Sequence, residues 1–148
     1  MAPASVRADP RSPPGEFDDL VDWFERFSTN LVLLEEYPCE EIGAATRAFV
    51  NAVREHMQSF AATLERLPSP LASLVPSRAI LRSDHVWFSD SLEQLEWLER
   101  IVEGEDHGGH RQALGQYGRV LAEALRRHRT DERAYLRAVA RSKGAPSS

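Results

Sequence analysis

Residues 114–140 have the sequence LGQYGRVLAEALRRHRTDERAYLRAVA, in which apolar side chains recur at every third or fourth position. This spacing places them on one face of an α-helix, because a helical turn takes about 3.6 residues. The apolar face consists of Leu114, Tyr117, Leu121, Leu125, Tyr135 and Val139. His128 and Glu132 stand on the same face, between Leu125 and Tyr135. The stretch therefore predicts a long amphipathic helix that buries two polar side chains.

Three other stretches show the same helical period, so the chain divides into four predicted helices. The helices cover about residues 17–37, 40–67, 78–103 and 110–141. Pro38 ends the first helix and Pro68 ends the second, because proline cannot continue a helix. The segment GEDHGGH, with its glycines, separates the last two helices. Long helices with short connectors predict an all-α protein, an up-down-up-down antiparallel four-helix bundle.

The bundle is expected to form a single domain, residues 17–141 of the 148-residue chain. Residues 1–16 (MAPASVRADPRSPPGE) are rich in proline and predict a disordered N-terminal segment, and residues 142–148 (SKGAPSS) predict a flexible tail. The N-terminal segment lacks the apolar run of a signal peptide. The chain also has no run of about 18 apolar residues that would span a membrane. A cytoplasmic protein without a membrane partner is therefore expected.

Charge and cysteine content exclude several classes of partner and site. The net charge of −5 argues against nucleic acid, because the chain has no excess of cationic charge to displace counterions from phosphates. Arginines are frequent in residues 126–141, but most alternate with acids at salt-bridging distance, which indicates a solvated face. Cys39 is the single cysteine, so neither an internal disulfide nor a thiolate-rich metal site can form.

Three histidines occupy positions on predicted buried faces where leucine would be expected. They are His56, His85 and His128, and Glu132 follows His128 by one helical turn. Burying imidazoles and a carboxylate costs free energy unless something pairs with them. One metal ion would be a partner for all of these side chains at once. The alternative is that each histidine is a hydrogen-bonded core residue.

The predicted topology brings the three histidines to a similar level in the bundle. His85 lies about 20 residues before the turn near residues 104–108, and His128 lies about 20 residues after it. His56 precedes Pro68 by about 12 residues, and the ten-residue connection 68–77 is long enough to make up the difference. His128 and Glu132 share a helix face because they are four residues apart. Imidazole and carboxylate ligands suit iron, zinc or manganese, and iron is favoured for dioxygen chemistry.

Three fragments resemble helices of the hemerythrin-like (HHE) cation-binding domains. LRRHRTDERAYL (125–136) resembles the fourth-helix His-x-x-x-Glu signature, and RSDHVWFSDSLEQLEWL (82–98) resembles the third helix. VREHMQSFAATLERL (53–67) resembles the second helix of that family. The resemblance covers about residues 17–140. It implies a four-helix bundle that binds non-haem iron, mono- or dinuclear, through His56, His85, His128 and Glu132.

The sequence also departs from that family's pattern, so the ligand set is incomplete. The family carries a carboxylate four residues after the second-helix histidine, where this chain has Phe60. No histidine precedes His56, and the first-helix positions level with it lie near the apolar residues Val21 and Phe24. The remaining ligands predict one iron ion, or an unequal pair completed by Glu25 or water. Two of the histidines could alternatively bind a haem.

The resemblance implies that a diatomic gas or a small molecule is the partner. The expected functions are binding or sensing of dioxygen or nitric oxide, or metal-dependent oxidation of a small molecule. Two alternatives stand beside them. One is a metal-free bundle that acts as a protein-interaction module, in which the histidines bond one another and Glu132. The other is a haem-binding bundle, which needs a roomier cavity.

Overall fold

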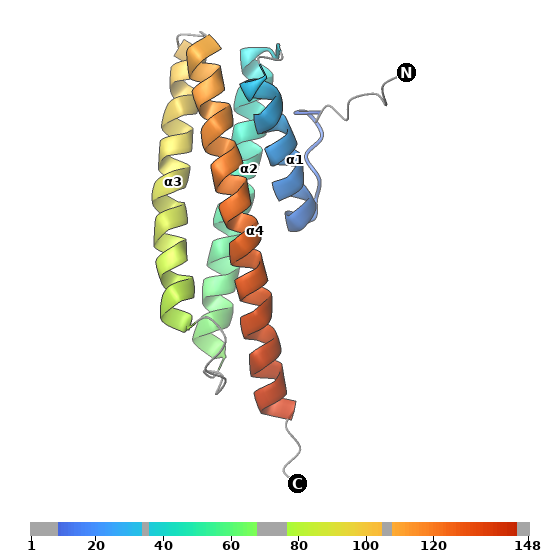
Figure 1. Ribbon diagram of the computed structural model, residues 1–148, viewed down its shortest axis with the longest axis vertical. Coiled ribbons are helices and arrows are strands. Elements are labelled where there is room, and N and C mark those ends of the chain that lie inside the picture. The colour runs from blue at the N-terminus through green and yellow to red at the C-terminus, as the bar shows by residue number, and fades with distance from the viewer. Residues whose placement is uncertain (1–8, 34–35, 68–76, 105–107, 145–148) are drawn as a thin grey trace.

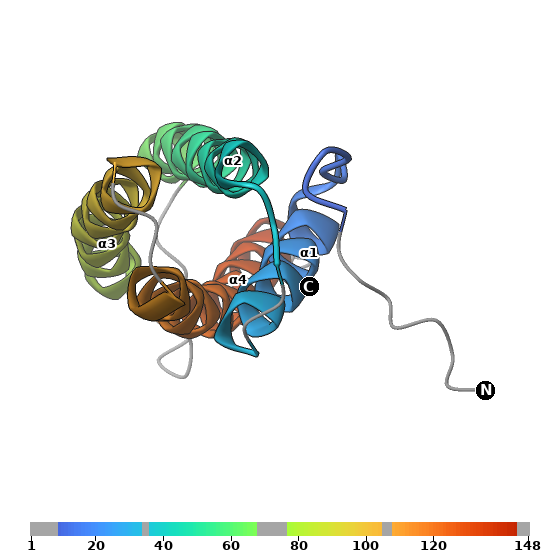
Figure 2. The ribbon, with the colours of Figure 1, turned by 90° about the horizontal axis from the view of Figure 1, so that it is seen from above.

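The computed structural model describes residues 9–33, 36–67, 77–104 and 108–144, and all regular structure within them is helical. The four helices are α1 (Phe17–Val32), α2 (Cys39–Arg66), α3 (Arg78–Gly104) and α4 (Gly108–Gly144). They lie side by side, and successive helices run in opposite directions (Figure 1). Packing contacts join α1 to α4, α2 to α3, α3 to α4 and α1 to α2, so the helices form a closed ring (Figure 2). The predicted all-α up-down-up-down bundle is confirmed.

The helices differ in length, and this divides the bundle into two parts. The first helix has 16 residues, whereas α4 has 37. Consequently α1 lies beside only one part of α4, and below the start of α1 the bundle continues as three helices, α2, α3 and α4 (Figure 1). We call these parts the four-helix half and the three-helix half. None of the helices that the described residues form is long and apolar enough to cross a membrane.

The predicted first helix, residues 17–37, is too long, because α1 ends at Val32. Tyr37 lies outside the helix, where its buried ring packs 4.9 Å from that of Phe27 and its hydroxyl accepts a hydrogen bond from Asn30. The guanidinium of Arg111, on α4, donates to the carbonyl of Tyr37 at 2.6 Å. The following proline disfavours a helical conformation at Tyr37, so this carbonyl is available to a neighbouring helix.

The ends of the predicted domain are described in part. Residues 1–8 of the predicted N-terminal segment lie outside the described residues, as do residues 145–148 of the predicted tail. Within residues 9–16, the Asp9 carbonyl accepts a hydrogen bond from the indole of Trp23 at 2.9 Å, and Arg11 forms an ion pair with Glu41 at 2.7 Å. These contacts hold the segment against α1 and α2. The last helix continues three residues beyond the predicted end at Arg141.

Buried apolar side chains form two separate cores along the bundle axis. The main core fills the four-helix half and includes Phe24, Phe27, Phe49, Val53, Leu92, Leu95, Leu121 and Leu125. The second core lies in the three-helix half and consists of Phe60, Leu64, Leu81, Tyr135 and Val139. On each of α2, α3 and α4, the predicted polar core residues fall between these two sets. The cores are therefore separated by a polar layer.

Two glycines allow α1 and α4 to approach each other closely in the four-helix half. A Cβ atom on Gly115 would lie 2.9 Å from the Cβ atom of Leu31. A Cβ atom on Gly118 would lie 2.9 Å from the ring of Phe24 and still closer to the hydroxyl of Ser28. These separations are too short for real side chains, so the packing of α1 on α4 requires glycine at both positions.

Candidate metal centre

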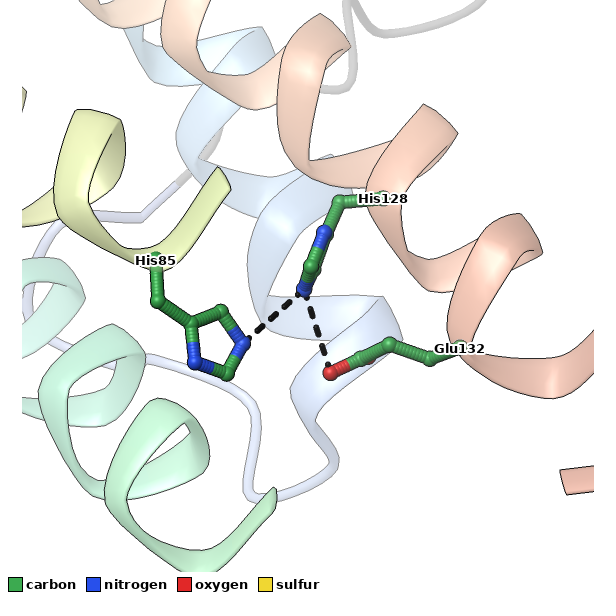
Figure 3. A group of neighbouring side chains, drawn as sticks. All are labelled: His85, His128 and Glu132. Carbon is green, nitrogen blue, oxygen red and sulfur yellow. Dashed lines mark hydrogen bonds and ion pairs between the residues drawn. The ribbon is translucent and has the colours of Figure 1, made fainter. Parts of the chain in front are cut away.

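The four polar core residues predicted from the sequence meet at the junction of the two halves. His56 comes from α2, His85 from α3, and His128 and Glu132 from α4. His128 is 2% exposed and Glu132 is fully buried. The Nε2 atoms of His85 and His128 lie 3.1 Å apart, and the Nε2 atom of His128 lies 3.3 Å from a carboxylate oxygen of Glu132 (Figure 3). We call these four residues the His–Glu cluster.

The spacing of three members suits a single metal ion. One ligand atom each from His85, His128 and Glu132 can be chosen so that all lie within 4.8 Å of one another. Donors bound at about 2.1 Å, with angles of about 90–109° between them, lie roughly 3.0–3.4 Å apart. The separations of 3.1 and 3.3 Å from His128 to the other two donors fall in this interval, and the donors of His85 and Glu132 lie within 4.8 Å of each other. Two imidazoles and one carboxylate can therefore hold a transition-metal ion and leave further coordination positions for other ligands.

His56 has a different place from the other three members of the cluster. Its Nε2 atom lies 2.9 and 3.1 Å from the two carboxylate oxygens of Glu132, which are acceptors, so this nitrogen carries a proton and donates. The ring of Phe17, the first residue of α1, stacks on the His56 ring at 4.1 Å and an angle of 7°. His56 thus orients the carboxylate of Glu132 through both of its oxygens.

Asp84 is a functional candidate that sequence reasoning missed. Its carboxylate accepts a hydrogen bond of 2.9 Å from Nδ1 of His128. Histidines that bind metals usually donate their second ring nitrogen to a carboxylate, which fixes the tautomer and leaves Nε2 free for the metal. Asp84 precedes His85 on α3 and lies off the apolar stripe. The sequence signal that could have identified Asp84 is its position next to a predicted ligand, His85.

Arg129 is a second contact of the cluster that the sequence analysis did not single out. Its Nη1 atom donates to Glu132 at 3.1 Å, and its Nε atom donates to Asp18 of α1 at 2.9 Å. Arg133, one turn further along α4, also contacts Asp18. The arginine-rich stretch was predicted to be a solvated face, and this is wrong for Arg129, whose side chain is 21% exposed. The guanidinium reaches inward because Glu132 lies three residues away on the same helix.

The pKa values of the cluster's members shift in different directions because their surroundings differ. Burial alone would raise the pKa of Glu132, but hydrogen bonds from His128 and His56 outweigh burial and lower the pKa of Glu132 to about 2. Burial, reinforced by the charge of His128, lowers the pKa of His85. Burial also opposes the charge on His128, yet its hydrogen bonds to Glu132 and Asp84 raise the pKa of His128. At neutral pH the cluster therefore offers an ionised carboxylate and a neutral imidazole, the states that bind metals.

Aromatic rings pack against the histidines of the cluster. The Phe60 ring lies 6.3 Å from that of His56 and 6.1 Å from that of His85, and the Phe88 ring lies 5.2 Å from that of His128. Phe60 thus occupies space between two histidines, four residues after His56. Glu25, which was considered as a further ligand, pairs with Arg126 instead. Of the two alternatives for completing an unequal metal pair, Glu25 or water, the structure contradicts Glu25, because Arg126 holds its carboxylate on the α1–α4 surface.

A surface groove between α3 and α4 reaches one wall of the cluster. It has a volume of about 390 Å³, and Asp84 and His128 are among its lining residues. Trp87 and Val120, both exposed, contribute apolar surface from opposite helices. A small molecule in this groove would contact the hydrogen-bonded pair of Asp84 and His128.

No family model, curated protein or solved structure matches this chain. The likeness to hemerythrin-like cation-binding domains therefore depends on helix order and on the short motifs within residues 53–136.

Proposed function

We propose that the protein is a hemerythrin-like non-haem iron protein with a reduced ligand set. His85, His128 and Glu132 would bind one iron ion, and His56 would hold the carboxylate of Glu132 in place. The observation that carries this proposal is the spacing of 3.1 and 3.3 Å between donors from two helices, of which His128 and Glu132 are buried and His85 is half-buried. A site of two histidines and one carboxylate with open positions is typical of non-haem Fe(II) proteins.

Two carboxylates beside His128 would favour the binding of a divalent cation. Glu132 and Asp84 contribute two negative charges beside the donor nitrogens of His128. Asp18 forms ion pairs with both Arg129 and Arg133. A divalent ion bound beside His128 would lie next to the fully buried carboxylate of Glu132 and the partly exposed carboxylate of Asp84, and opposite charges at short range favour its binding. In the absence of metal, the hydrogen bonds of His128 to Glu132 and Asp84 raise its pKa and favour a proton there instead.

An iron ion in this position would have coordination positions that the protein does not fill. Iron supplies a centre that binds dioxygen or nitric oxide and accepts or donates electrons. The neighbouring phenylalanine rings and the burial of Glu132 shield this carboxylate from water, which strengthens its electrostatic interactions. The proposed function is therefore gas binding or sensing, or oxidation of a small molecule that approaches between the helices.

A metal-free interaction module is the second candidate, and the hydrogen bonding of the cluster favours it. His56 donates to Glu132, His128 donates to Asp84, and His85 lies within hydrogen-bond distance of His128. Among the described residues, only the hydroxyl of Ser28 is a buried side-chain polar atom without a hydrogen-bond partner. The cluster can therefore satisfy its polar groups without a cation.

A haem fits the two closest histidines less well than a single ion does. Two axial imidazole nitrogens lie on opposite sides of a flat macrocycle, about 4 Å apart. The Nε2 atoms of His85 and His128 are only 3.1 Å apart, and a carboxylate oxygen lies beside them. This arrangement suits donors on one ion.

Anaerobic reconstitution with Fe²⁺, followed by metal analysis and an optical spectrum, tests the proposal. We expect about one iron per chain, and we expect His128→Ala to abolish iron retention while helical content stays the same. His110→Ala is the matched control, because His110 lies at the start of α4 and outside the cluster. Wild-type protein that retains no iron would support the metal-free module, and a Soret band would support haem. Normal iron content in His128→Ala would refute the site.

A further inference from the structure

We propose that Arg129 limits the site to one metal ion by holding a guanidinium where a second cation would lie. This inference rests on the proposed function, because it concerns the number of ions that the His–Glu cluster binds. It makes Arg129 a specificity-determining residue. The ion pairs of this arginine with Glu132 and Asp18 would otherwise only attach α1 to α4.

The two oxygens of Glu132 face different cationic groups. One oxygen lies 3.3 Å from Nε2 of His128, on the side of the proposed ion. The other accepts a hydrogen bond of 3.1 Å from Nη1 of Arg129. In two-metal sites the ions are about 3.5–4 Å apart, and a carboxylate can bind one ion with each oxygen. Here a guanidinium takes the second of these two places.

The two carboxylates that contact the guanidinium are themselves suitable metal donors. Asp18 accepts from Nε of Arg129 at 2.9 Å, and the Nε2 atom of His56 lies 2.9 Å from the same Glu132 oxygen that Arg129 contacts. Two carboxylates, from α1 and α4, thus contact the guanidinium, and the imidazole of His56 lies against the Glu132 oxygen that Arg129 contacts. The guanidinium cannot lose its proton in a protein, so this charge is permanent. A second ion is therefore excluded both by space and by repulsion.

Removal of the guanidinium should convert this place into a second cation site. With Arg129 present, its guanidinium is the cationic partner of one Glu132 oxygen and of Asp18, which also contacts Arg133. Without Arg129, oxygens of Asp18 and Glu132 lose a cationic partner, and the cluster gains one unit of negative charge. A divalent ion with water ligands would contact both carboxylates and replace the lost positive charge.

Metal stoichiometry in the full-length chain tests this inference. Wild-type protein and Arg129→Ser would each be equilibrated anaerobically with Mn²⁺, and bound manganese would be counted by metal analysis and native mass spectrometry. We expect one ion per chain in the wild type and two in Arg129→Ser. The two ions should be magnetically coupled in the paramagnetic resonance spectrum, because they share Glu132. Arg129→Gln carries the same expectation if the serine variant does not fold.

Three control variants separate exclusion of an ion from attachment of α1. Arg133→Ser removes a guanidinium that contacts Asp18 but has no contact with Glu132, so it should still bind one ion. Arg129→Lys keeps the charge and should also bind one ion. In the Arg129→Ser background, Asp18→Asn should restore the stoichiometry to one.

The outcomes distinguish this inference from the proposed function. Wild-type protein that binds no ion would overturn the proposed function, and the inference with it. One ion in the wild type and one in folded Arg129→Ser and Arg129→Gln would overturn the inference alone. A second ion that shows the spectrum of isolated Mn²⁺ would also overturn it, because that ion would lie elsewhere.

Discussion

The four-helix half and the three-helix half bury their apolar side chains in different ways. The four-helix half surrounds its core with α1, α2, α3 and α4 and brings α1 and α4 together at two glycines. The three-helix half buries a smaller set of side chains from α2, α3 and α4 alone. The His–Glu cluster lies where one arrangement changes to the other, at the first residue of α1. The polar groups of the cluster therefore lie in the layer between the two apolar cores.

Two buried glutamates show how strongly local partners decide the state of a carboxyl group. Glu132 receives hydrogen bonds from His128 and His56, and its pKa is lowered to about 2. Glu99 is also buried, between α2 and α3 in the four-helix half, and Arg47 is its cationic partner. Burial and the neighbouring Glu103 raise the pKa of Glu99 to about 7. Glu132 is therefore equipped as an anionic ligand, whereas Glu99 holds a proton near neutral pH.

Truncation of matched leucines should have the largest effect and tests the difference between the cores. Leu92 belongs to the main core and Leu64 to the second core, and both are at most 1% exposed. We expect Leu92→Ala to reduce the free energy of unfolding by about 4 kcal/mol and Leu64→Ala by about 2 kcal/mol, because three helices can collapse around a cavity more easily than four. Urea unfolding of the metal-free protein measures both. An equal or larger loss for Leu64→Ala would show that the two halves are packed alike.

Substitution of Gly118 should have the next largest effect, and it affects only the four-helix half. The new Cβ atom of Gly118→Ala would lie 2.9 Å from Phe24, so α1 must move away from α4. We expect a loss of about 1–3 kcal/mol in the free energy of unfolding, as for other overpacked sites. Gly109→Ala is the control, since its Cβ atom meets nothing within 4 Å, and it should be neutral or slightly stabilising. Thermal unfolding of both variants provides the comparison.

Asp84→Asn tests the polar layer between the cores. The variant keeps an oxygen that can accept from His128 but removes the charge that favours the metal-binding tautomer. We expect about a 10–100-fold loss of metal affinity, equivalent to roughly 1.4–2.7 kcal/mol, with little change in stability of the metal-free protein. Titration with Co²⁺, followed by absorbance, measures the affinity. Asp90→Asn, on the exposed side of α3, should bind like the wild type, and an unchanged affinity for Asp84→Asn would remove Asp84 from the site.

Glu99→Gln should have the smallest effect, which depends on pH. The pKa of Glu99 in the folded protein, about 7, is higher than its unfolded value, so the folded state binds more protons between the two. Stability should consequently fall as pH rises from about 4.5 to 7. Gln cannot ionise, so the variant should be more stable than the wild type at pH 8, by about 1–2 kcal/mol, and similar to it at pH 4.5. Urea unfolding at the two pH values measures both proteins. The same difference in free energy of unfolding between variant and wild type at both pH values would contradict this expectation.

Much of the fold and part of the site follow from helical periodicity. The apolar stripes predict four helices, and the short turn after α3 predicts that His85 and His128 lie level, as they do at 3.1 Å. Periodicity could not identify Asp84 or Arg129, because both lie off the stripes and act only through contacts with a neighbouring side chain. The end of α1 was misplaced because Tyr37 was assigned to the helix, whereas Arg111, 74 residues away in sequence, binds its carbonyl. Such long-range partners leave no local pattern.

The stacking of Phe17 on His56 has a consequence for how an ion would reach the cluster. Phe17 is the first residue of α1, and no side chain caps the helix at Glu16. Opening of this turn breaks the ring contact and the ion pairs of Asp18 with Arg129 and Arg133, at a cost in free energy below that of global unfolding. We therefore expect cation uptake to occur in the folded chain at a rate set by fraying of this turn, independently of refolding.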